Sequence, residues 1–219
     1  MAYSDFTLKK VKSDLGLKIV ENRSLFSATP PLEISDYLSQ TLKRNVPLAL
    51  SINTEKARSE LIIVNILLEV KDKLSGEIGL FSGIDFNVDR DRGLVGFCDY
   101  IISGSSEQFY LDRPVITIVE AKNENIISGL GQCVAEMYAA NLFNEQENIN
   151  LSTIYGAVTT GDEWRFLQLE KQTIAIDLDS YYISNIAKIV GILVQMANLT
   201  TNNNPPPNPL PRGGETNSQ

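Results

Sequence analysis

Two acidic residues and one lysine lie within or at the end of apolar segments. Asp99 lies in the segment GFCDYII, and Glu120 and Lys122 come at the end of the apolar run that starts at Pro114. Residues i and i+2 of a strand point to the same face, so we expect Glu120 and Lys122 to share one site, with Ala121 turned into the body of the protein. If the two segments are neighbouring strands, Asp99 joins the same site.

This set of side chains suits metal-dependent cleavage of a phosphodiester. Divalent ions held by carboxylates neutralise the anionic diester and generate a nucleophile from bound water. A nearby lysine positions or deprotonates that water, or stabilises the developing charge. The chain has no histidine, which excludes His-dependent nucleophiles and His-ligated zinc and leaves oxygen ligands, which suit Mg²⁺ or Mn²⁺. The alternative interpretation is a charge pair at a strand end without any chemical role.

The flanking sequence predicts the elements that would position these residues. A largely buried helix is predicted at 53–72, because apolar residues crowd its later turns on all sides. A hairpin is predicted from 77–88 and 94–102, and a strand buried on both faces at 114–120. A loop, a helix, a second hairpin, a short strand and a closing amphipathic helix follow, at 123–129, 130–146, 152–170, 173–178 and 181–199. This order predicts a mixed sheet with helices on its faces.

The chain is expected to contain a folded domain between two less regular ends. Residues 1–52 predict an irregular or mixed arm, with one short helix that Ser35 could cap and that Pro47 would end. The folded domain itself is expected at residues 53–199. The segment 200–219 is rich in Asn, Pro and Gly and cannot form a core, so we expect a disordered tail.

Composition and charge narrow the class of protein. The two cysteines lack zinc or disulfide spacing, and the chain shows neither a membrane-spanning apolar run nor a signal-peptide core, which favours a cytoplasmic protein with no membrane contact. The net charge of −8 argues against a large non-specific nucleic-acid footprint, since phosphate contacts dominate such binding. A local positive groove, or DNA delivered by a protein partner, remains compatible with this charge.

The stretch CDYIISG…PVITIVEAKNENIISGLGQCVAEM resembles the core of the PD-(D/E)XK, or restriction endonuclease-like, nuclease superfamily. The likeness spans most of residues 53–170. It implies an α/β fold in which a mixed β-sheet core is flanked by helices. Asp99 resembles the motif aspartate, and Glu120 and Lys122 resemble the E-x-K half. The nuclease domains of type I restriction subunits are the most similar group.

The resemblance adds a metal ligand on the first helix. Glu55, in TEKARSELII, resembles the leading glutamate of those domains, and Glu60 is the alternative for the same place. Five residues apart on a helix, the two lie about 140° apart, so one of them is expected at the site. It would join Asp99 and Glu120 around the ion, with the carbonyl oxygen of Ala121 completing the shell.

The resemblance also suggests a polar residue on the second helix. Gln132 matches a glutamine that some relatives carry there, with a role in orienting the water or the lysine; a helix residue without any role is the alternative. In those relatives a tyrosine follows four residues later, whereas this chain has Glu136.

Function and partners follow from the resemblance as expectations. It implies a Mg²⁺- or Mn²⁺-dependent endonuclease that hydrolyses DNA as a restriction or repair component, as a homodimer or together with a protein partner. Lys56 and Arg58 are the candidates for nucleic-acid contact, and Arg58, one turn from Glu55, could meet a phosphate. The alternative is a catalytically silent scaffold of the same fold that binds a protein partner.

Overall fold

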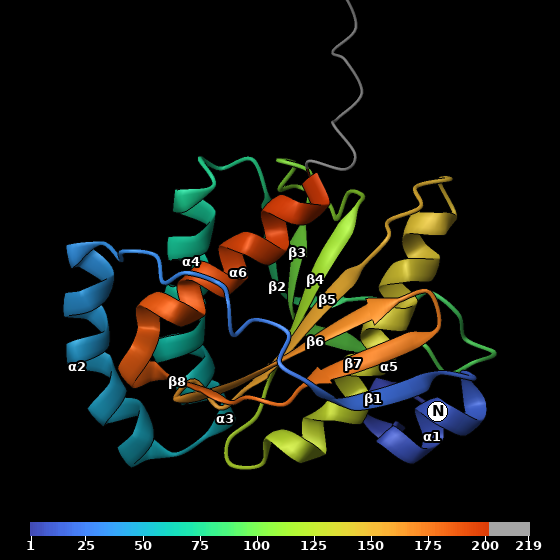
Figure 1. The fold of residues 1–219 in the computed structure, drawn as a ribbon, viewed down its shortest axis with the longest axis horizontal. Helices are drawn as coiled ribbons and strands as arrows, with labels where there is room; N and C mark the ends of the chain where they lie inside the picture. Colours follow the sequence, from blue (N-terminus) through green and yellow to red (C-terminus); the bar gives the residue numbers. More distant parts are fainter. Residues whose placement is uncertain (202–219) are drawn as a thin grey trace, which may run out of the picture.

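A computed structural model describes residues 1–201 as one mixed β-sheet with helices on both faces (Figure 1). The strands are β1 (Lys18–Arg23), β2 (Gly79–Asp85), β3 (Phe97–Ser103), β4 (Val115–Ala121), β5 (Ile154–Thr159), β6 (Glu163–Glu170), β7 (Thr173–Asp177) and β8 (Tyr181–Tyr182). Their order across the sheet is β1-β7-β6-β5-β4-β3-β2, and β8 pairs with β6. The β1–β7 and β4–β5 pairs are parallel, and the other pairs are antiparallel.

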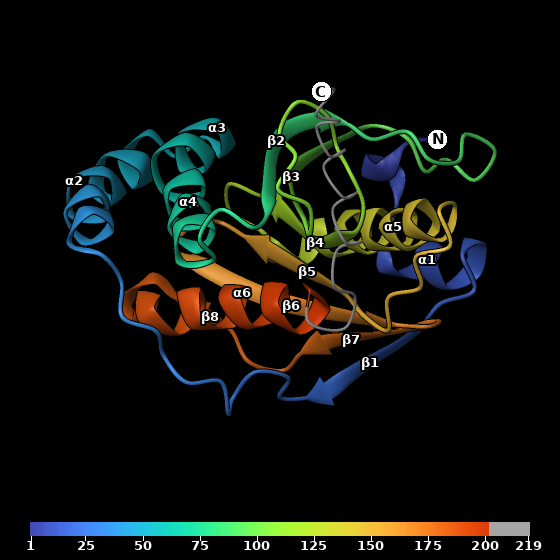
Figure 2. The same ribbon diagram turned by 90° about the horizontal axis from the view of Figure 1, so that it is seen from above.

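Helices cover the two faces of the sheet in separate groups. They are η1 (Tyr3–Asp5), α1 (Leu8–Asp14), α2 (Asp36–Ile52), α3 (Glu55–Arg58), the π-helical η2 (Ser59–Ile63), α4 (Val64–Lys73), α5 (Ile126–Glu145), η3 (Ile183–Asn185) and α6 (Ile186–Thr201). α5 packs on β4 and β5 with α1 against it, while α6, α4 and α2 lie on the other side (Figure 2). Each face has its own cluster of buried apolar side chains.

β4 is buried along its whole length, as its apolar sequence predicts. Antiparallel β3 lies on one side of it and parallel β5 on the other, so that Ile118 stands between Ile101 and Gly156. Near the end of α5, the Asn144 side chain accepts a hydrogen bond from the Val115 N–H and donates one to the Val115 carbonyl, both at 2.8 Å. These bonds hold the end of α5 at the start of β4, so the helix runs back along the strand.

α5 starts earlier than the sequence predicts. The segment 123–129 was expected to be a loop, yet the helix begins at Ile126. Asn125 caps this start, because its side-chain oxygen accepts hydrogen bonds from the backbone N–H groups of Ile127 and Ser128. The first turn of α5 therefore lies directly beside the end of β4.

The helix predicted at 53–72 is confirmed in extent but is not a uniform α-helix. α3 and α4 are joined by the π-helical segment η2, which has a wider turn. Glu60 falls inside this segment. The angle of about 140° expected between Glu55 and Glu60 applies to an ideal α-helix, so it does not describe this pair.

Residues 1–52 are more regular than the irregular or mixed arm that the sequence indicates. They form η1, α1, β1 and α2, and α2 runs through Pro47 because Leu42 and Ala49 pack into the core on either side of it. β1 is an edge strand with mostly exposed side chains, so its sequence KIVENR lacks the apolar alternation of a strand signal.

The closing helix predicted at 181–199 is confirmed from Ile186 onward, after the short β8 and η3. From residue 202 the expected disordered tail lies outside the described residues. Within residues 1–201, no helix has both the length and the apolar character needed to cross a bilayer.

Candidate functional site at the end of β4

The predicted triad of Asp99, Glu120 and Lys122 comes together at the end of β4. β3 and β4 are neighbours, with Tyr100 opposite Val119. The Lys122 ammonium donates a hydrogen bond to Glu120 Oε1, which confirms that these two side chains share a face. Asp99 Oδ2 accepts a hydrogen bond from the Ala121 backbone N–H at 2.8 Å. Glu120 therefore bonds to the amine directly, while Asp99 on the adjacent strand bonds to the backbone between Glu120 and Lys122.

Glu55 is a second acid close to this amine. Its Oε2 lies 4.0 Å from Lys122 Nζ, and its side chain is 49 % exposed. Glu60, the alternative for this place, instead pairs with Lys56 at 3.5 Å on the surface. The structure thus places Glu55 beside Lys122, while Glu60 and Lys56 form an exposed i,i+4 pair that contributes little to stability.

The residues of the site differ in how far they are buried. Glu120 is fully buried, and its Oε2 has no hydrogen-bond partner among the described residues. Asp99 is half-buried, and the Lys122 side chain is 18 % exposed. A buried carboxylate oxygen without a partner is costly, so it needs a compensating group.

The electrostatics of the site follow from this burial. Burial, followed by the negative charge of Asp99, raises the pKa of Glu120 to about 8, although Lys122 opposes the shift. Burial lowers the pKa of Lys122, but Glu120, Glu55 and Asp99 together raise it above its ordinary value. Lys122 therefore stays positively charged at neutral pH.

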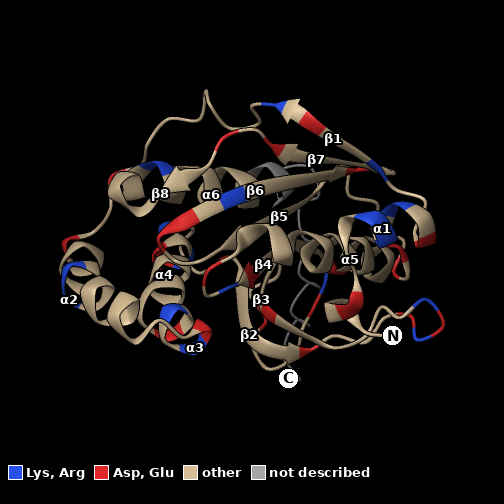
Figure 3. Ribbon diagram, turned by 90° about the horizontal axis from the view of Figure 1, so that it is seen from below, with Lys and Arg blue, Asp and Glu red and all other residues tan. Residues whose placement is uncertain are grey.

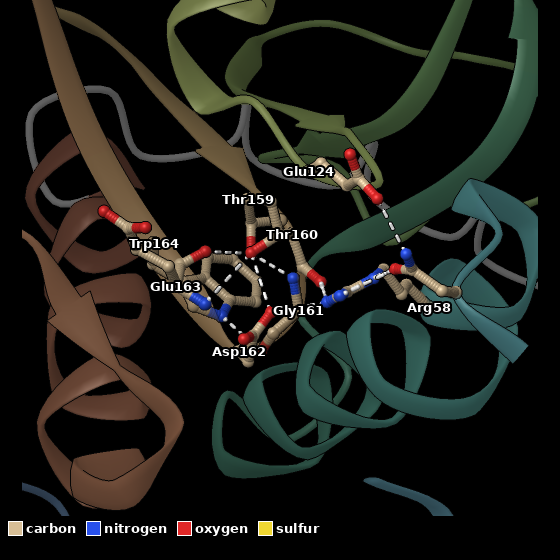
Figure 4. A network of polar contacts seen from close by, with 9 residues as sticks. Arg58, Glu124, Thr159, Thr160, Gly161, Asp162, Glu163 and Trp164 are labelled. Carbon is tan, nitrogen blue, oxygen red and sulfur yellow. Dashed lines mark hydrogen bonds and ion pairs between the residues drawn. The ribbon is translucent and has the colours of Figure 1, made fainter. Parts of the chain in front are cut away.

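A polar network fixes the neighbouring chain segments relative to the strand ends (Figure 4). Arg58 donates hydrogen bonds to the Asn53 side chain, to the Thr160 carbonyl at 2.7 Å and to Asp162 Oδ1 at 2.5 Å. Asn53 in turn donates to Glu124 Oε1 at 2.7 Å. The network ties the start of α3 to the β5–β6 turn and to the β4–α5 loop, which sets the position of Glu55.

The structure places Arg58 differently from what the phosphate-contact hypothesis requires. Its side chain is only 10 % exposed, and the guanidinium already binds groups of the protein itself. Lysine and arginine positions are spread over α1, α2, α3 and β6 in the described chain and do not form one stripe (Figure 3). A nucleic acid would therefore meet few basic side chains near the end of β4.

Gln132 lies on α5 and contacts an acid that the sequence interpretation did not assign to the site. Its Nε2 donates a hydrogen bond to Glu136 Oε1 at 3.0 Å. Glu136 is fully buried, and its Oε2 has no hydrogen-bond partner among the described residues. The signal was present in the sequence, because an acid in the apolar run CVAEMYAA of a core helix is unusual.

The donor set fits a magnesium-type ion. Within residues 1–201, no group of three or more acidic, cysteine or histidine side chains is arranged so that it could hold a metal ion. Mg²⁺ does not require such a cage, because it commonly keeps several waters and binds through one or two carboxylates. Asp99 and Glu120 supply two carboxylates, and no donor among the described residues bonds to Glu120 Oε2. The two cysteines, Cys98 and Cys133, are buried free thiols.

The candidate site is defined by its own residues near the end of β4. They are the carboxylates of Asp99 and Glu120 on adjacent strands and the ammonium of Lys122, which lies near Glu120 and Glu55. Comparisons of the chain with protein-family models, with curated proteins and with solved structures found no match.

Proposed function

We propose that this protein is a cytoplasmic, Mg²⁺- or Mn²⁺-dependent nuclease with a restriction endonuclease-like fold that hydrolyses phosphodiester bonds in DNA. One observation supports the proposal most directly. Glu120 is buried with one oxygen that has no partner within residues 1–201, it accepts a hydrogen bond from the charged Lys122, and Asp99 on the adjacent strand bonds to the neighbouring Ala121 N–H. This is the combination of carboxylates and amine that metal-assisted hydrolysis uses.

Each residue has a distinct role in this proposal. Asp99 and Glu120 would hold the ion, the carbonyl oxygen of Ala121 would add a further ligand, and Glu55 would help to hold a second ion or a water at the open side. When bound, the ion supplies a nucleophilic water and neutralises charge on the phosphate. Lys122, kept in its charged form by the surrounding acids, suits positioning of the water and stabilisation of developing negative charge better than proton abstraction.

The substrate would be held through a small footprint. The net charge of −8 and the internal bonding of Arg58 leave few basic groups for phosphate contact. A protein partner that supplies basic surface, as in a restriction or repair complex, would provide the missing affinity.

The decisive experiment is a titration of the protein with Mn²⁺ by calorimetry, followed by cleavage assays on single-stranded, duplex and branched DNA. We expect metal uptake, metal-dependent cutting, and a loss of cutting of at least about 10²-fold in Lys122→Ala with the fold intact. Lys43→Ala is the matched control, because it removes an exposed lysine of α2 that has no role in the proposed site. Absence of both metal uptake and cutting in the wild type would contradict the proposal.

A catalytically silent scaffold of the same fold is the second candidate, and an exposed apolar face favours it. Tyr37, Leu48 and Ile52 on α2 are 75 %, 53 % and 49 % exposed, and their spacing of 11 and 4 residues places them on one side of the helix. Such a face suits a protein partner or a second copy of the chain. The scaffold alternative predicts no metal uptake, together with a change in oligomeric state in Leu48→Asp measured by light scattering.

A further inference from the structure

We propose that Glu136 is a further acidic member of this site: a positioning residue whose negative charge, directed at Glu120, increases the affinity of the site for a divalent cation. This inference rests on the proposed function, because it concerns the same site. It adds a residue on α5 that the motif on β3 and at the end of β4 does not contain.

The packing of α5 on β4 brings Glu136 toward the site. At the first turn of α5, Gly129 lies so close to Lys122 that an added Cβ would stand 3.1 Å from the lysine Cγ and Cε. Residues 129, 132 and 136 are spaced by three and four, so they lie on one face of the helix. Side chains in a helix tilt toward its N-terminus, so the carboxyl of Glu136 points back toward Gln132 and the site. The Gln132–Glu136 hydrogen bond shows this direction.

The surroundings of Glu136 are unfavourable for an acid that has only a structural role. It is fully buried, its neighbours Cys133 and Met137 on α5 are apolar, and only one of its oxygens is hydrogen-bonded within the described residues. Glu120 shows the same pattern, with a single bonded oxygen. Burial, followed by the charge of Glu120, raises the pKa of Glu136 well above its ordinary value. Two buried acids that oppose each other in this way destabilise the protein.

The acids around the end of β4 outnumber the bases, so their charges do not balance when they are ionised. Four acids, at Glu55, Asp99, Glu120 and Glu136, interact with the single amine of Lys122. A divalent cation would offset this excess directly, because opposite charges in a buried environment attract strongly. Gln132 then has a defined part, since its amide holds Glu136 in the orientation from which its charge reaches Glu120.

The test is the isosteric variant Glu136→Gln, which retains an acceptor for Gln132 and removes only the ability to ionise. We expect Mn²⁺ affinity, measured by calorimetry, to fall by about 10–100-fold, as is typical when outer-sphere partners of a metal site are removed. The Tm of the metal-free variant should rise above that of the wild type at pH 7, because the fold no longer buries an acid whose pKa lies well above its ordinary value. Glu145→Gln is the matched control, since it removes the same charge from the end of the same helix.

Metal affinity separates a role in the site from a structural role. If Glu136 were only a neutral core acid, the substitution would also raise the Tm but would leave Mn²⁺ affinity unchanged, and this result would overturn the inference. Gln132→Leu offers a second test. We expect a smaller loss of Mn²⁺ affinity, because Glu136 keeps its carboxyl group but loses the hydrogen bond that orients it. If the wild type takes up no cation at all, the proposed function fails as well, so the two failures are distinguishable.

Discussion

At the scale of single residues, the position of the Lys122 side chain depends on Gly129, which has no side chain of its own. A Cβ at Gly129 would meet Val158 Cγ1 at 2.8 Å and the aliphatic chain of Lys122 at 3.1 Å. The absence of a Cβ lets the first turn of α5 approach β4 closely enough to hold Lys122 against Glu120. The position of the amine is therefore set by packing as well as by charge.

Gly129→Ala should displace Lys122 and destabilise the protein. We expect the free energy of unfolding, measured with urea, to fall by about 1–3 kcal/mol, which is typical of overpacking. Ile127→Ala, an exposed position in the same turn, is the control and should change it by less than about 0.5 kcal/mol. An alanine variant as stable as the wild type, with unchanged activity, would show that the close approach is not needed.

At the scale of elements, the helices that carry Glu55 are anchored through one buried acid. Glu69 on α4 accepts hydrogen bonds from the backbone N–H of Ser35 at 2.7 Å and from its hydroxyl at 2.6 Å. Ser35 is also the N-cap of α2, where its Oγ accepts from the Leu38 N–H. Lys73 lies 3.3 Å from Glu69 on the other side. These contacts fix the start of α2 on α4, and thereby the path of the chain into α3.

This anchor predicts a pH-dependent stability. Burial raises the pKa of Glu69, but the two bonds from Ser35 and the charge of Lys73 outweigh it and lower the pKa below 4.5. The carboxylate therefore stabilises the fold above about pH 4.5, and this contribution is lost as the pH falls through the lowered pKa of the folded state.

Glu69→Gln tests that dependence by thermal and urea unfolding at pH 7 and pH 3. We expect a loss of about 1.5–3 kcal/mol at pH 7, where hydrogen bonds to a charged acceptor are removed, and a smaller difference at pH 3. Glu77→Gln, at an exposed acid, serves as the control. Equal destabilisation at both pH values would mean that the charge of Glu69 does not contribute.

At the scale of the whole molecule, the N-terminal residues belong to the same core as the site. Buried side chains from the first elements pack in one cluster with residues of β3, β4 and α5; they are Tyr3, Phe6, Val11, Leu15 and Leu17. An added Cβ at Gly131 would stand 2.5 Å from the Phe6 carbonyl oxygen, so η1 lies directly on α5. β1 pairs with β7 and forms one edge of the sheet.

A chain that begins at residue 53 should therefore fail to fold. Each lost apolar side chain contributes about 1.5–3 kcal/mol, and five of them approach or exceed the usual net stability of about 5–15 kcal/mol. Circular dichroism and gel filtration would detect the unfolded chain. Tyr3→Phe is the control, because it removes only the hydrogen bond to the Phe86 carbonyl and should cost about 1 kcal/mol. A folded, cooperatively melting fragment would instead place the domain boundary near residue 53.

Local sequence patterns were sufficient for the site's central residues and for most elements. Alternation along β4 puts Glu120 and Lys122 on one face, and this depends only on the period of a strand. The apolar run at 114–120 predicts a buried central strand for the same reason. Edge strand β1 and the continuation of α2 through Pro47 were not predicted, because their stabilisation comes from distant partners rather than from neighbours in the chain.

Tertiary packing alone decided which further residues lie near the triad. Glu55 and Glu60 are equivalent in sequence, and the hydrogen bonds of Arg58 across three segments place Glu55 beside Lys122. Glu136 lies on a helix far along the chain from Asp99, so its approach to the site depends on how α5 packs on β4. Sequence period determines which side chains share a face; long-range packing determines which faces meet.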